Sequence, residues 1–511
     1  MIRFWSVESD PAAQGRISGA KPVAVLDIGS NSVRLVVYER PARALTVLYN
    51  EKSASGLGRG VAATGKLSQA SMARALKAVR RFAMVCKLTE VGDIYVIATS
   101  ATREAANGPE FVRIVEEVIG VPVRVLSGAE EAHYAALGLV SGMPGFDGVI
   151  GDLGGGSLEL AAVAGREDRA GETHELGAIR LQDDSGMTPA RAVEIARERL
   201  ARSKVLKAGH YKAFGAVGGT WRALAKLHQA RTKYPLHMVQ DYTVPAKDML
   251  ELCDLLVKGD KKPLSGMDAV SRSRKGLLPY GAAVLAEVLR AGDFEEVVFS
   301  ALGVREGYLF DQLDPNEKSA DPLLQATAEI SALRSRAPDF SSDLIEGSKA
   351  LFDMIGIAET RDEERLRIAS CYISDIGWRA HPDYRGEQSV DMVAFSDIIG
   401  IGHPGRAFLA QTLAYRYMGF KQKSASERLL ALAGEALNAR ARLLGAFFRV
   451  AYPLTAAMPG ILPQTSFAVR GETLVLRLPG DLAFLDGERL YGRHKQLAQE
   501  AGFKTGEIEV G

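Results

Sequence analysis

Two stretches of the chain carry an aspartate two residues before a glycine-containing turn. The first is VAVLDIGSNSVRLVVYE, from Val23 to Glu39, and the second is VIGDLGGGSLELAAVA, from Val149 to Ala164. Each is typical of a β-hairpin, with an apolar strand, a turn of small residues and a second apolar strand. Small residues let backbone N–H groups converge on an anion, particularly phosphate. The predicted phosphate-binding residues are the two turns: Gly29, Ser30, Asn31 and Ser32, and Gly154, Gly155, Gly156 and Ser157.

The two aspartates, Asp27 and Asp152, end the first strand of each hairpin. Two carboxylates directed at one phosphate repel it unless a hard cation such as Mg²⁺ lies between them. We therefore expect Mg²⁺, or another hard divalent cation, between two loops that together hold a phosphate. An ordinary glycine-rich turn is the alternative for either copy alone, and the matched aspartates favour the functional interpretation.

Three further segments offer polar groups near helix starts. In VLSGAEEAHYAALGLV, Ser127 and Glu130 have the spacing of a capping box, which leaves Glu131 without a structural task. The segment IYVIATSATREAANG predicts a strand that passes into a helix, with Arg103 in the first turn, where the helix dipole disfavours a cation. A bound anion would resolve that conflict, and the alternative is an arginine turned to solvent. Amides at a predicted helix start are offered by Gly218, Gly219 and Thr220.

The elements that must position these groups follow an α/β pattern up to about Leu313. Strand-like runs such as VAVLDIG, DIYVIATS, VIGDLGG, AFGAVGG and EEVVFSALG alternate with helical stretches. Amphipathic helical segments then continue to about Pro463, and from Ser466 the alternation of SFAVRGETLVLRLPG returns, with a helix near Arg489 to Ala501. The predicted divisions are an extension (1–20), two α/β domains (21–145 and 146–314), a helical domain (315–465) and a small α+β appendage (466–511).

Composition limits the possible partners and surroundings. The 511 residues carry a formal net charge of +1, without the basic excess expected of a DNA-binding protein. Three widely spaced cysteines, Cys86, Cys253 and Cys371, give neither a disulfide framework nor zinc spacing and favour a reducing cytoplasm. No apolar run approaches the roughly 18 residues of a membrane span, so no membrane association is expected.

An ordered set of motifs carries a family resemblance: DIGSNSVRLVV, TSATREA, SGAEEA, DLGGGSLEL, LGAIRL, VGGT and ALGVREG. In this order they resemble the Ppx/GppA exopolyphosphatase and guanosine pentaphosphate phosphatase family of the actin-like ATPase superfamily. The resemblance covers about Val23 to Leu313 well and the rest loosely. It implies two ribonuclease-H-like domains that face each other across a cleft, in which a terminal phosphoanhydride is hydrolysed.

The resemblance also implies roles for single residues. Glu131 matches the glutamate taken as the base that activates water, and Glu159 matches an acid associated with the metal site. Arg103 matches an arginine that contacts the phosphate chain, and Arg274 matches a position that can bind substrate. Arg180 and Arg305 also match, and a structural ion pair is at least an equal alternative for Arg274 and for both of these residues. Gly218 departs from the family's common serine, which puts any contact through that hydroxyl in doubt.

The helical part resembles HD-type phosphohydrolase domains, but CYISDIGWRAH has Ser374-Asp375 where His-Asp would stand. Asp375 and His381 are too few donors for a two-metal site, so this HD-like domain is expected to be catalytically silent and to form a homodimer. A local basic excess between His403 and Val450 is expected either to hold the distal part of a polyanion or to form a solvated helix face. Its basic residues are Arg406, Arg416, Lys421, Lys423, Arg428, Arg440, Arg442 and Arg449.

Together these features predict an exopolyphosphatase that releases orthophosphate from inorganic polyphosphate, with Glu131 preparing water for in-line attack. The same residues would serve a pppGpp phosphatase. An actin-like kinase would need an acceptor for its phosphoryl group, and a non-catalytic sensor of polyphosphate or nucleotide would bind and release nothing.

Overall fold

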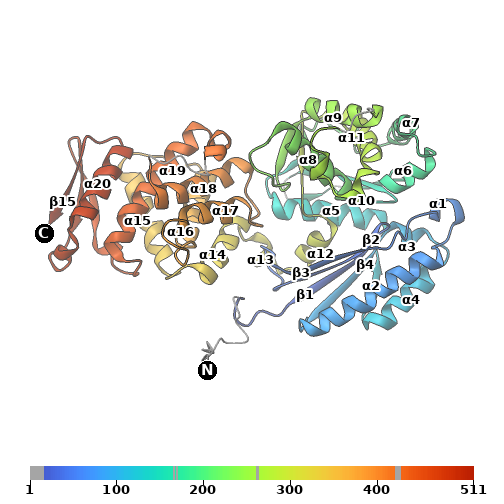
Figure 1. Cartoon of the computed structure of the whole chain (residues 1–511), viewed down its shortest axis with the longest axis horizontal. Coiled ribbons are helices and arrows are strands. Elements are labelled where there is room, and N and C mark those ends of the chain that lie inside the picture. Colours follow the sequence, from blue (N-terminus) through green and yellow to red (C-terminus); the bar gives the residue numbers. More distant parts are fainter. Residues whose placement is uncertain (1–15, 165–166, 169–170, 260–263, 421–426) are drawn as a thin grey trace, which may run out of the picture. The chain divides into compact units, whose positions relative to one another are not determined.

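The computed structural model describes residues 16–164, 167–168, 171–259, 264–420 and 427–511. The chain divides into two compact units, Met1–Ala320 and Asp321–Gly511, and Figure 1 labels most of their helices and some of their strands. Every helix within the described ranges is too short or too polar to cross a lipid bilayer.

The first unit begins with a five-stranded sheet of order β3-β2-β1-β4-β5. Its first three strands are antiparallel, and β4 and β5 then add parallel to β1. The strands are β1 (Val23–Ile28), β2 (Ser32–Tyr38), β3 (Val47–Ala54), β4 (Asp93–Ala98) and β5 (Val123–Val125). The two strands of the first predicted hairpin are β1 and β2, whereas the polar sequence of β3 gave no strand prediction.

The alternation of residues in β1 determines which groups reach the site. Ala24, Leu26 and Ile28 pack against α2 (Gln69–Leu88) and α4 (Gly108–Ile119), the two helices beside this sheet in Figure 1. Val23 and Val25 pack on the opposite face, with Tyr134 of α5 (Gly128–Gly142) and Tyr308 of α12 (Val304–Gln312). Because side chains alternate along a strand, Asp27 shares the face that meets α5 and α12.

The second sheet has seven strands in the order β11-β12-β10-β6-β7-β8, with β9 also paired to β7. Its strands are β6 (Asp147–Leu153), β7 (Leu158–Ala164), β8 (Glu167–Asp168), β9 (Glu172–His174), β10 (Ala213–Val217), β11 (Tyr242–Pro245) and β12 (Glu296–Phe299). The second predicted hairpin is β6 and β7, which are antiparallel. The predicted mixed α/β fold is therefore confirmed.

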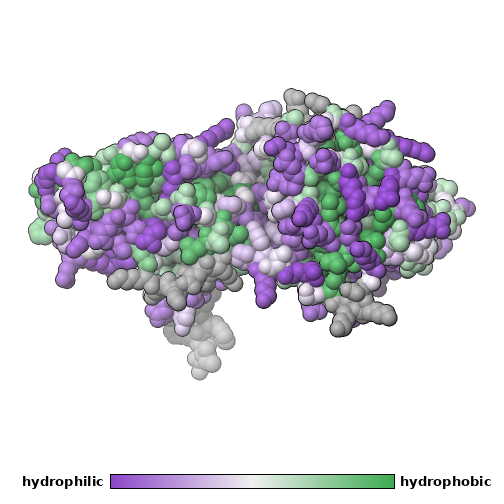
Figure 2. Space-filling view, turned by 90° about the horizontal axis from the view of Figure 1, so that it is seen from above, coloured by the Kyte–Doolittle hydropathy of each residue, from purple (hydrophilic) through white to green (hydrophobic). Residues whose placement is uncertain are grey.

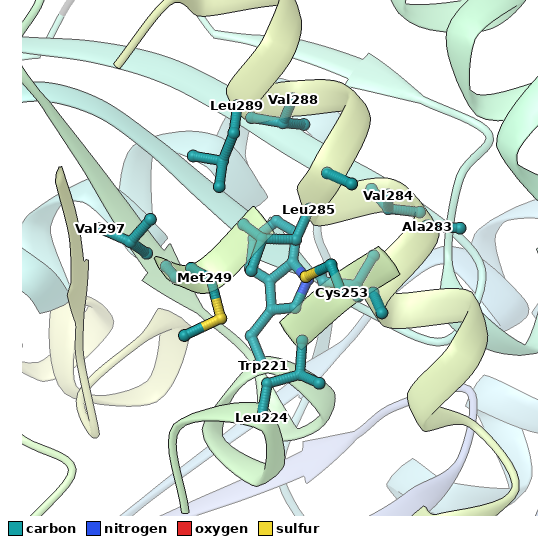
Figure 3. Packing of buried hydrophobic residues seen from close by; sticks show 14 of the residues in the cluster. Trp221, Leu224, Met249, Cys253, Ala283, Val284, Leu285, Val288, Leu289 and Val297 are labelled. Atoms are coloured by element: carbon teal, nitrogen blue, oxygen red, sulfur yellow. The ribbon is translucent and has the colours of Figure 1, made fainter. Parts of the chain in front are cut away.

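The two faces of this sheet have separate cores. On one face, Val149 and Leu160 belong to a large apolar cluster, and Figure 3 shows its part around Trp221, with Met249, Cys253 and Leu285. On the other face, Ile150 and Ala161 pack against the alanines of α5. Asp152 and Glu159 alternate with the first set and so face α5. The remaining helices of the unit are α1 (Val61–Thr64), α3 (Ser100–Glu104), α6 (Ala178–Asp184), α7 (Pro189–Leu200), α8 (Gly219–Thr232), α9 (Ala246–Lys258), η1 (Met267–Ala269), α10 (Arg272–Lys275), α11 (Leu278–Gly292) and α13 (Pro315–Ser319).

Helices α5 and α12 meet through glycines. A Cβ on Gly138 would lie 2.1 Å from the carbonyl oxygen of Gly303, and one on Gly307 would lie 1.8 Å from that of Tyr134. Only glycine fits such close backbone contact. This crossing fixes the helix that carries Glu131 against the helix that carries Arg305.

The second unit is helical up to its C-terminal sheet. That sheet has the order β13-β14-β15, and α20 packs against β15 and β14. Its elements are α14 (Pro322–Arg334), α15 (Phe340–Met354), α16 (Arg361–Ile373), α17 (Arg385–Ala394), α18 (His403–Met418), α19 (Glu427–Thr455), η2 (Leu462–Gln464), β13 (Ser466–Arg470), β14 (Thr473–Leu478), η3 (Gly480–Leu485), α20 (Glu488–Glu500) and β15 (Thr505–Val510). On the face shown in Figure 2, hydrophilic and hydrophobic residues are interspersed.

Candidate active site

The two predicted loops have the same internal hydrogen bond. The N–H of Gly29 donates to the carbonyl of Ser32 at 3.1 Å, and the N–H of Gly154 donates to that of Ser157 at 3.0 Å. The loops also approach each other, because a Cβ on Gly155 would lie 2.9 Å from the Cβ of Ser30. Glycine at position 155 therefore allows the two turns to face one another at close range.

Most of the predicted site residues line one cleft between the two sheets. They are Asp27, Gly29, Ser30, Asn31, Ser32, Glu131, Asp152, Gly154, Gly155, Glu159, Gly218, Gly219, Thr220 and Arg274. Three others, Arg103, Gly156 and Ser157, lie outside this lining. Gly156 is nevertheless adjacent to it, since a Cβ there would lie 2.8 Å from the hydroxyl of Ser100, which does line the cleft.

Carboxylates occupy one side of the cleft. Asp152 and Glu159 are direct partners across the β6–β7 hairpin. Burial raises the pKa of Asp152 to about 6; the charge of Arg222 opposes this shift and the charge of Asp27 contributes to it. Burial, followed by the charges of Glu131 and Asp152, raises the pKa of Glu159 well above its usual value. Desolvation and neighbouring negative charges therefore both oppose the ionisation of Asp152 and Glu159.

Glu131 lies in the first turn of α5, where Ser127 and Glu130 form the predicted capping box. Its side chain is 7% exposed. Burial raises the pKa of Glu131 to about 7, although the adjacent Arg103 favours its charged form. A carboxylate with a pKa near neutrality is suited to accept a proton from water.

Arg103 lies in α3, but as the fourth of its five residues and in the last turn rather than at the predicted helix start, and its partner is within the protein. Its guanidinium forms an ion pair with the carboxylate of Glu131 and donates to the carbonyl of Leu126 at 2.6 Å. The anion beside Arg103 in this structure is therefore the candidate base, and its contact with a phosphate chain stays a prediction.

Basic groups occupy the other side of the cleft, in a row across the first sheet. Asp27 lies opposite Arg34 on β2, and Arg34 lies opposite Lys52 on β3. Partners in register point to the same face of a sheet. Part of Lys52 is exposed, but desolvation of its amine and the positive charges of Arg274 and Arg34 lower its pKa to about 8.

The second sheet and its helices add three arginines to this side. Arg222 follows the predicted Gly219-Thr220 pair in the first turn of α8, and Arg274 donates to the hydroxyl of Thr220 at 3.2 Å. Arg305 of α12 forms an ion pair with Asp27 at 2.8 Å. At the start of α8, Gly218 has a φ of 108°, and a Cβ on Gly219 would lie 2.3 Å from Arg274.

The sequence interpretation did not include Arg34, Lys52 and Arg222, which all line the cleft. Arg34 could have been found by aligning the two hairpins, because it occupies the position of Glu159. Lys52 depends on the register of an unpredicted strand, and no sequence signal indicates it. The structural alternative for Arg180 and Arg305 agrees with the structure, where Arg180 pairs with Glu104 and Glu175 and Arg305 with Asp27.

The predicted metal ligands can be tested against the chemistry of this site. Asp152 and Glu159 face one another, and Oε1 of Glu159 is buried without a hydrogen-bond partner in the described part of the chain. Burial raises the pKa of both carboxyls, and the charges of Glu131 and Asp152 add to the effect on Glu159, so a bound cation would stabilise the ionised forms. Among the described residues, however, no group of three or more His, Cys, Asp or Glu side chains is gathered as a preformed metal site. The donor types fit a hard cation, and Mg²⁺ stays a prediction.

The residues singled out in the helical part have local partners. Ser374 donates to the carbonyl of Cys371 at 2.7 Å, and His381 is 64% exposed in a loop, where it accepts from the N–H of Asp383.

Several arginines of the basic segment between His403 and Val450 also have hydrogen-bond or ion-pair partners within the protein. Arg406 donates to backbone carbonyls, while Arg440 and Arg442 pair with Glu363 and Glu500. These three therefore do not form a free solvated face. Lys421, Lys423 and the side chain of Arg428 lie outside the described residues.

Comparison with known proteins agrees with this architecture. Exopolyphosphatase 2 of Mycobacterium tuberculosis is 29% identical over 288 residues, which is 52% of this chain and 90% of that protein. A crystal structure of an exopolyphosphatase from Cytophaga hutchinsonii superposes with a TM-score of 0.51 and 23% identity, covering 57% of this chain and 97% of that one; it supports the fold. The family model "Exopolyphosphatase, C-terminal" matches residues 323–508, and the model "Ppx/GppA phosphatase family" matches residues 36–316. The chain belongs to the Ppx/GppA phosphatase family.

Proposed function

We propose that the protein is an exopolyphosphatase that hydrolyses the terminal phosphoanhydride of inorganic polyphosphate. The observation that carries this proposal is the position of Glu131, a buried carboxylate with a pKa raised to about 7 beside two facing glycine loops. The family membership and the named relatives support the same activity.

The charges of the cleft suggest how the substrate lies. The terminal phosphate would accept hydrogen bonds from the amides of the two loops, and the preceding phosphates would meet Arg34, Lys52 and Arg274 on the basic side. Asp27, Asp152 and Glu159 are the residues that would hold Mg²⁺, which supplies charge neutralisation at the phosphate oxygens when bound.

Glu131 performs the proton transfer in this proposal. A water oxygen attacks the terminal phosphorus, its proton passes to the Glu131 carboxylate, and the bridging P–O bond breaks. The products are orthophosphate and a chain that is one unit shorter. Arg103 keeps Glu131 within the cleft and favours its ionised form.

Four further parts of the proposal rest on the sequence: pppGpp as a second substrate, the cytoplasmic location, the homodimer and the silent helical domain. The same site is suited to pppGpp, whose terminal phosphoanhydride has the same chemistry. We further propose a cytoplasmic homodimer with a catalytically silent HD-like helical domain. The catalytic silence of that domain is supported by Asp375, the aspartate of its Ser374-Asp375 pair, whose carboxylate is paired with Arg336 and Arg416.

A substrate panel tests the reaction class and the specificity together. Purified protein is incubated with polyphosphates of several lengths, pppGpp and ATP, with Mg²⁺ or with a chelator. The proposal predicts orthophosphate release from polyphosphate that stops when the metal is removed. Transfer of phosphate to an acceptor would instead indicate a kinase, and binding without any release would indicate a sensor.

A further inference from the structure

A second cavity, of about 390 Å³, lies entirely within the unit Asp321–Gly511. It shares no lining residue with the catalytic cleft. The loop after α14, the start of α17, the end of α18, α19 and α20 contribute to it. Its lining is Arg336, Pro382, Arg385, Arg416, Tyr417, Phe448, Arg449, Tyr452, Pro453, Arg489 and Arg493.

One buried carboxylate, that of Asp375, neutralises part of the positive charge of the arginines that line this cavity. Asp375 accepts two hydrogen bonds from Arg336, both at 3.1 Å, and pairs with Arg416 at 2.7 Å. The guanidinium of Arg416 also lies 3.6 Å above the ring of Tyr452. Both oxygens of the Asp375 carboxylate are thus bound by two arginines, and the cation–π contact with Tyr452 holds Arg416 in place.

The other four lining arginines have no carboxylate partner among the described residues. Arg449 donates to the backbone carbonyls of Tyr415 and Arg416. Its Nε and the Nε of Arg385 are buried and lack hydrogen-bond partners within the described ranges. These two guanidinium groups are therefore incompletely satisfied by the described residues, and their positive charge is left without a paired carboxylate.

Helix α20 adds a like-charge pair to the same cavity. Arg489 and Arg493 are one helical turn apart and both line it. Burial lowers the pKa of Arg493, and no carboxylate counteracts that effect. Like charges at this spacing destabilise a helix, and an anion between them would remove the repulsion.

We propose that this cavity binds a small oligophosphate anion with two or more phosphate groups. Six lining arginines face a single paired carboxylate, so several negative charges are needed to balance them. Guanidinium groups bind phosphate oxygens through two parallel hydrogen bonds. Short polyphosphates and the phosphate tails of nucleotides share this chemistry. The site would let the helical unit sense such anions separately from hydrolysis in the cleft.

Titration calorimetry on the full chain tests this site. The background is Glu131→Gln with a chelator present, which prevents turnover, and the probes are orthophosphate, tripolyphosphate and ATP. The double variant Arg489→Ala/Arg493→Ala removes two charges from the cavity. The matched control is Arg361→Ala/Lys495→Ala, since Arg361 and Lys495 are exposed, lie outside the cavity and include a lysine of the same helix α20.

The site predicts a binding event for tripolyphosphate, ATP or both that is weakened about tenfold or more in the cavity variant and unchanged in the control. Which probe loses affinity identifies the source of the phosphate groups. The proposal is overturned if every binding event keeps its affinity in the cavity variant, if the control loses as much, or if orthophosphate binds as tightly as tripolyphosphate. Should the double variant fail to fold by circular dichroism, Arg385→Gln provides the same comparison.

Discussion

Glu159 faces Asp152 directly across the β6–β7 hairpin, at the position where the first hairpin pairs Arg34 with Asp27. The two hairpins have the same hydrogen bond in the turn, but the residue opposite the aspartate is positive in the first hairpin and negative in the second. One half of the cleft is consequently acidic and suited to a cation. The other half is basic and suited to the phosphates that precede the bond to be cleaved.

Replacing Arg34 tests the basic half. Arg34→Ala should lower kcat/KM for polyphosphate by about 10- to 100-fold, mainly through KM, because a charge-assisted contact to the bound chain is lost. Arg81→Ala is the matched control, since Arg81 pairs with Glu51 at the surface and lies outside the cleft. Equal kinetics for the two variants would remove Arg34 from the substrate site.

The pH dependence of kcat/KM should reflect Glu131. A base acts when deprotonated, so activity should be present above a pKa of about 7 and fall as the pH drops through it. Arg103 favours the charged form, so Arg103→Gln should move this acid limb to higher pH at the same Mg²⁺ concentration. Arg113→Gln, which breaks an exposed pair with Glu117, should leave the limb in place. An acid limb that does not move in Arg103→Gln would contradict the pairing seen here.

The close approach of the loops can be tested with one methyl group. Gly155→Ala places a Cβ 2.9 Å from the Cβ of Ser30 and should lower kcat by about tenfold or more by separating the loops. Ser30→Gly removes the atom it strikes and should restore part of the activity. Gly145→Ala, which meets nothing within 4 Å, is the control. Full activity of Gly155→Ala would mean that the loops need not face each other this closely.

The crossing of α5 and α12 makes a prediction about stability. Gly307→Ala forces a Cβ to within 1.8 Å of a backbone oxygen and should destabilise the fold by about 1–3 kcal/mol or more. Differential scanning fluorimetry should show a lowered Tm, and kcat should fall because Glu131 and Arg305 shift together. Gly276→Ala, with open space around its Cβ, should keep the wild-type Tm. An unchanged Tm for Gly307→Ala would show that the helices separate freely.

Much of the first unit could be predicted because its signals are local. The strands β1, β2, β6 and β7 are continuous apolar runs around small-residue turns, and the Ser127–Glu130 capping box is visible in four residues. The strands β3, β11 and β15 were missed, because VLYNEKSA, YTVP and TGEIEV are polar or short. Their place depends on pairing with distant strands.

The site residues that belong to sequence motifs could be predicted. Those that reach the cleft only through the pairing register of a strand could not. Glu131 and the loop glycines follow from motifs, whereas Lys52 reaches the cleft only through its pairing with Arg34. The pairing of Arg103 with Glu131 joins residues from two helices that no local pattern relates. The basic residues between His403 and Val450 show the same limit. Arg440 and Arg442 form ion pairs with glutamates that lie far from them in the sequence.

The most direct test compares two neighbouring glutamates. Orthophosphate release from long-chain polyphosphate is measured for Glu131→Gln and for Glu130→Gln, which keeps a residue able to complete the capping box. We predict that Glu131→Gln loses about 10²–10⁴-fold in kcat while keeping the wild-type Tm, and that Glu130→Gln retains activity. Wild-type release by a folded Glu131→Gln protein would contradict the assignment of Glu131 as the base.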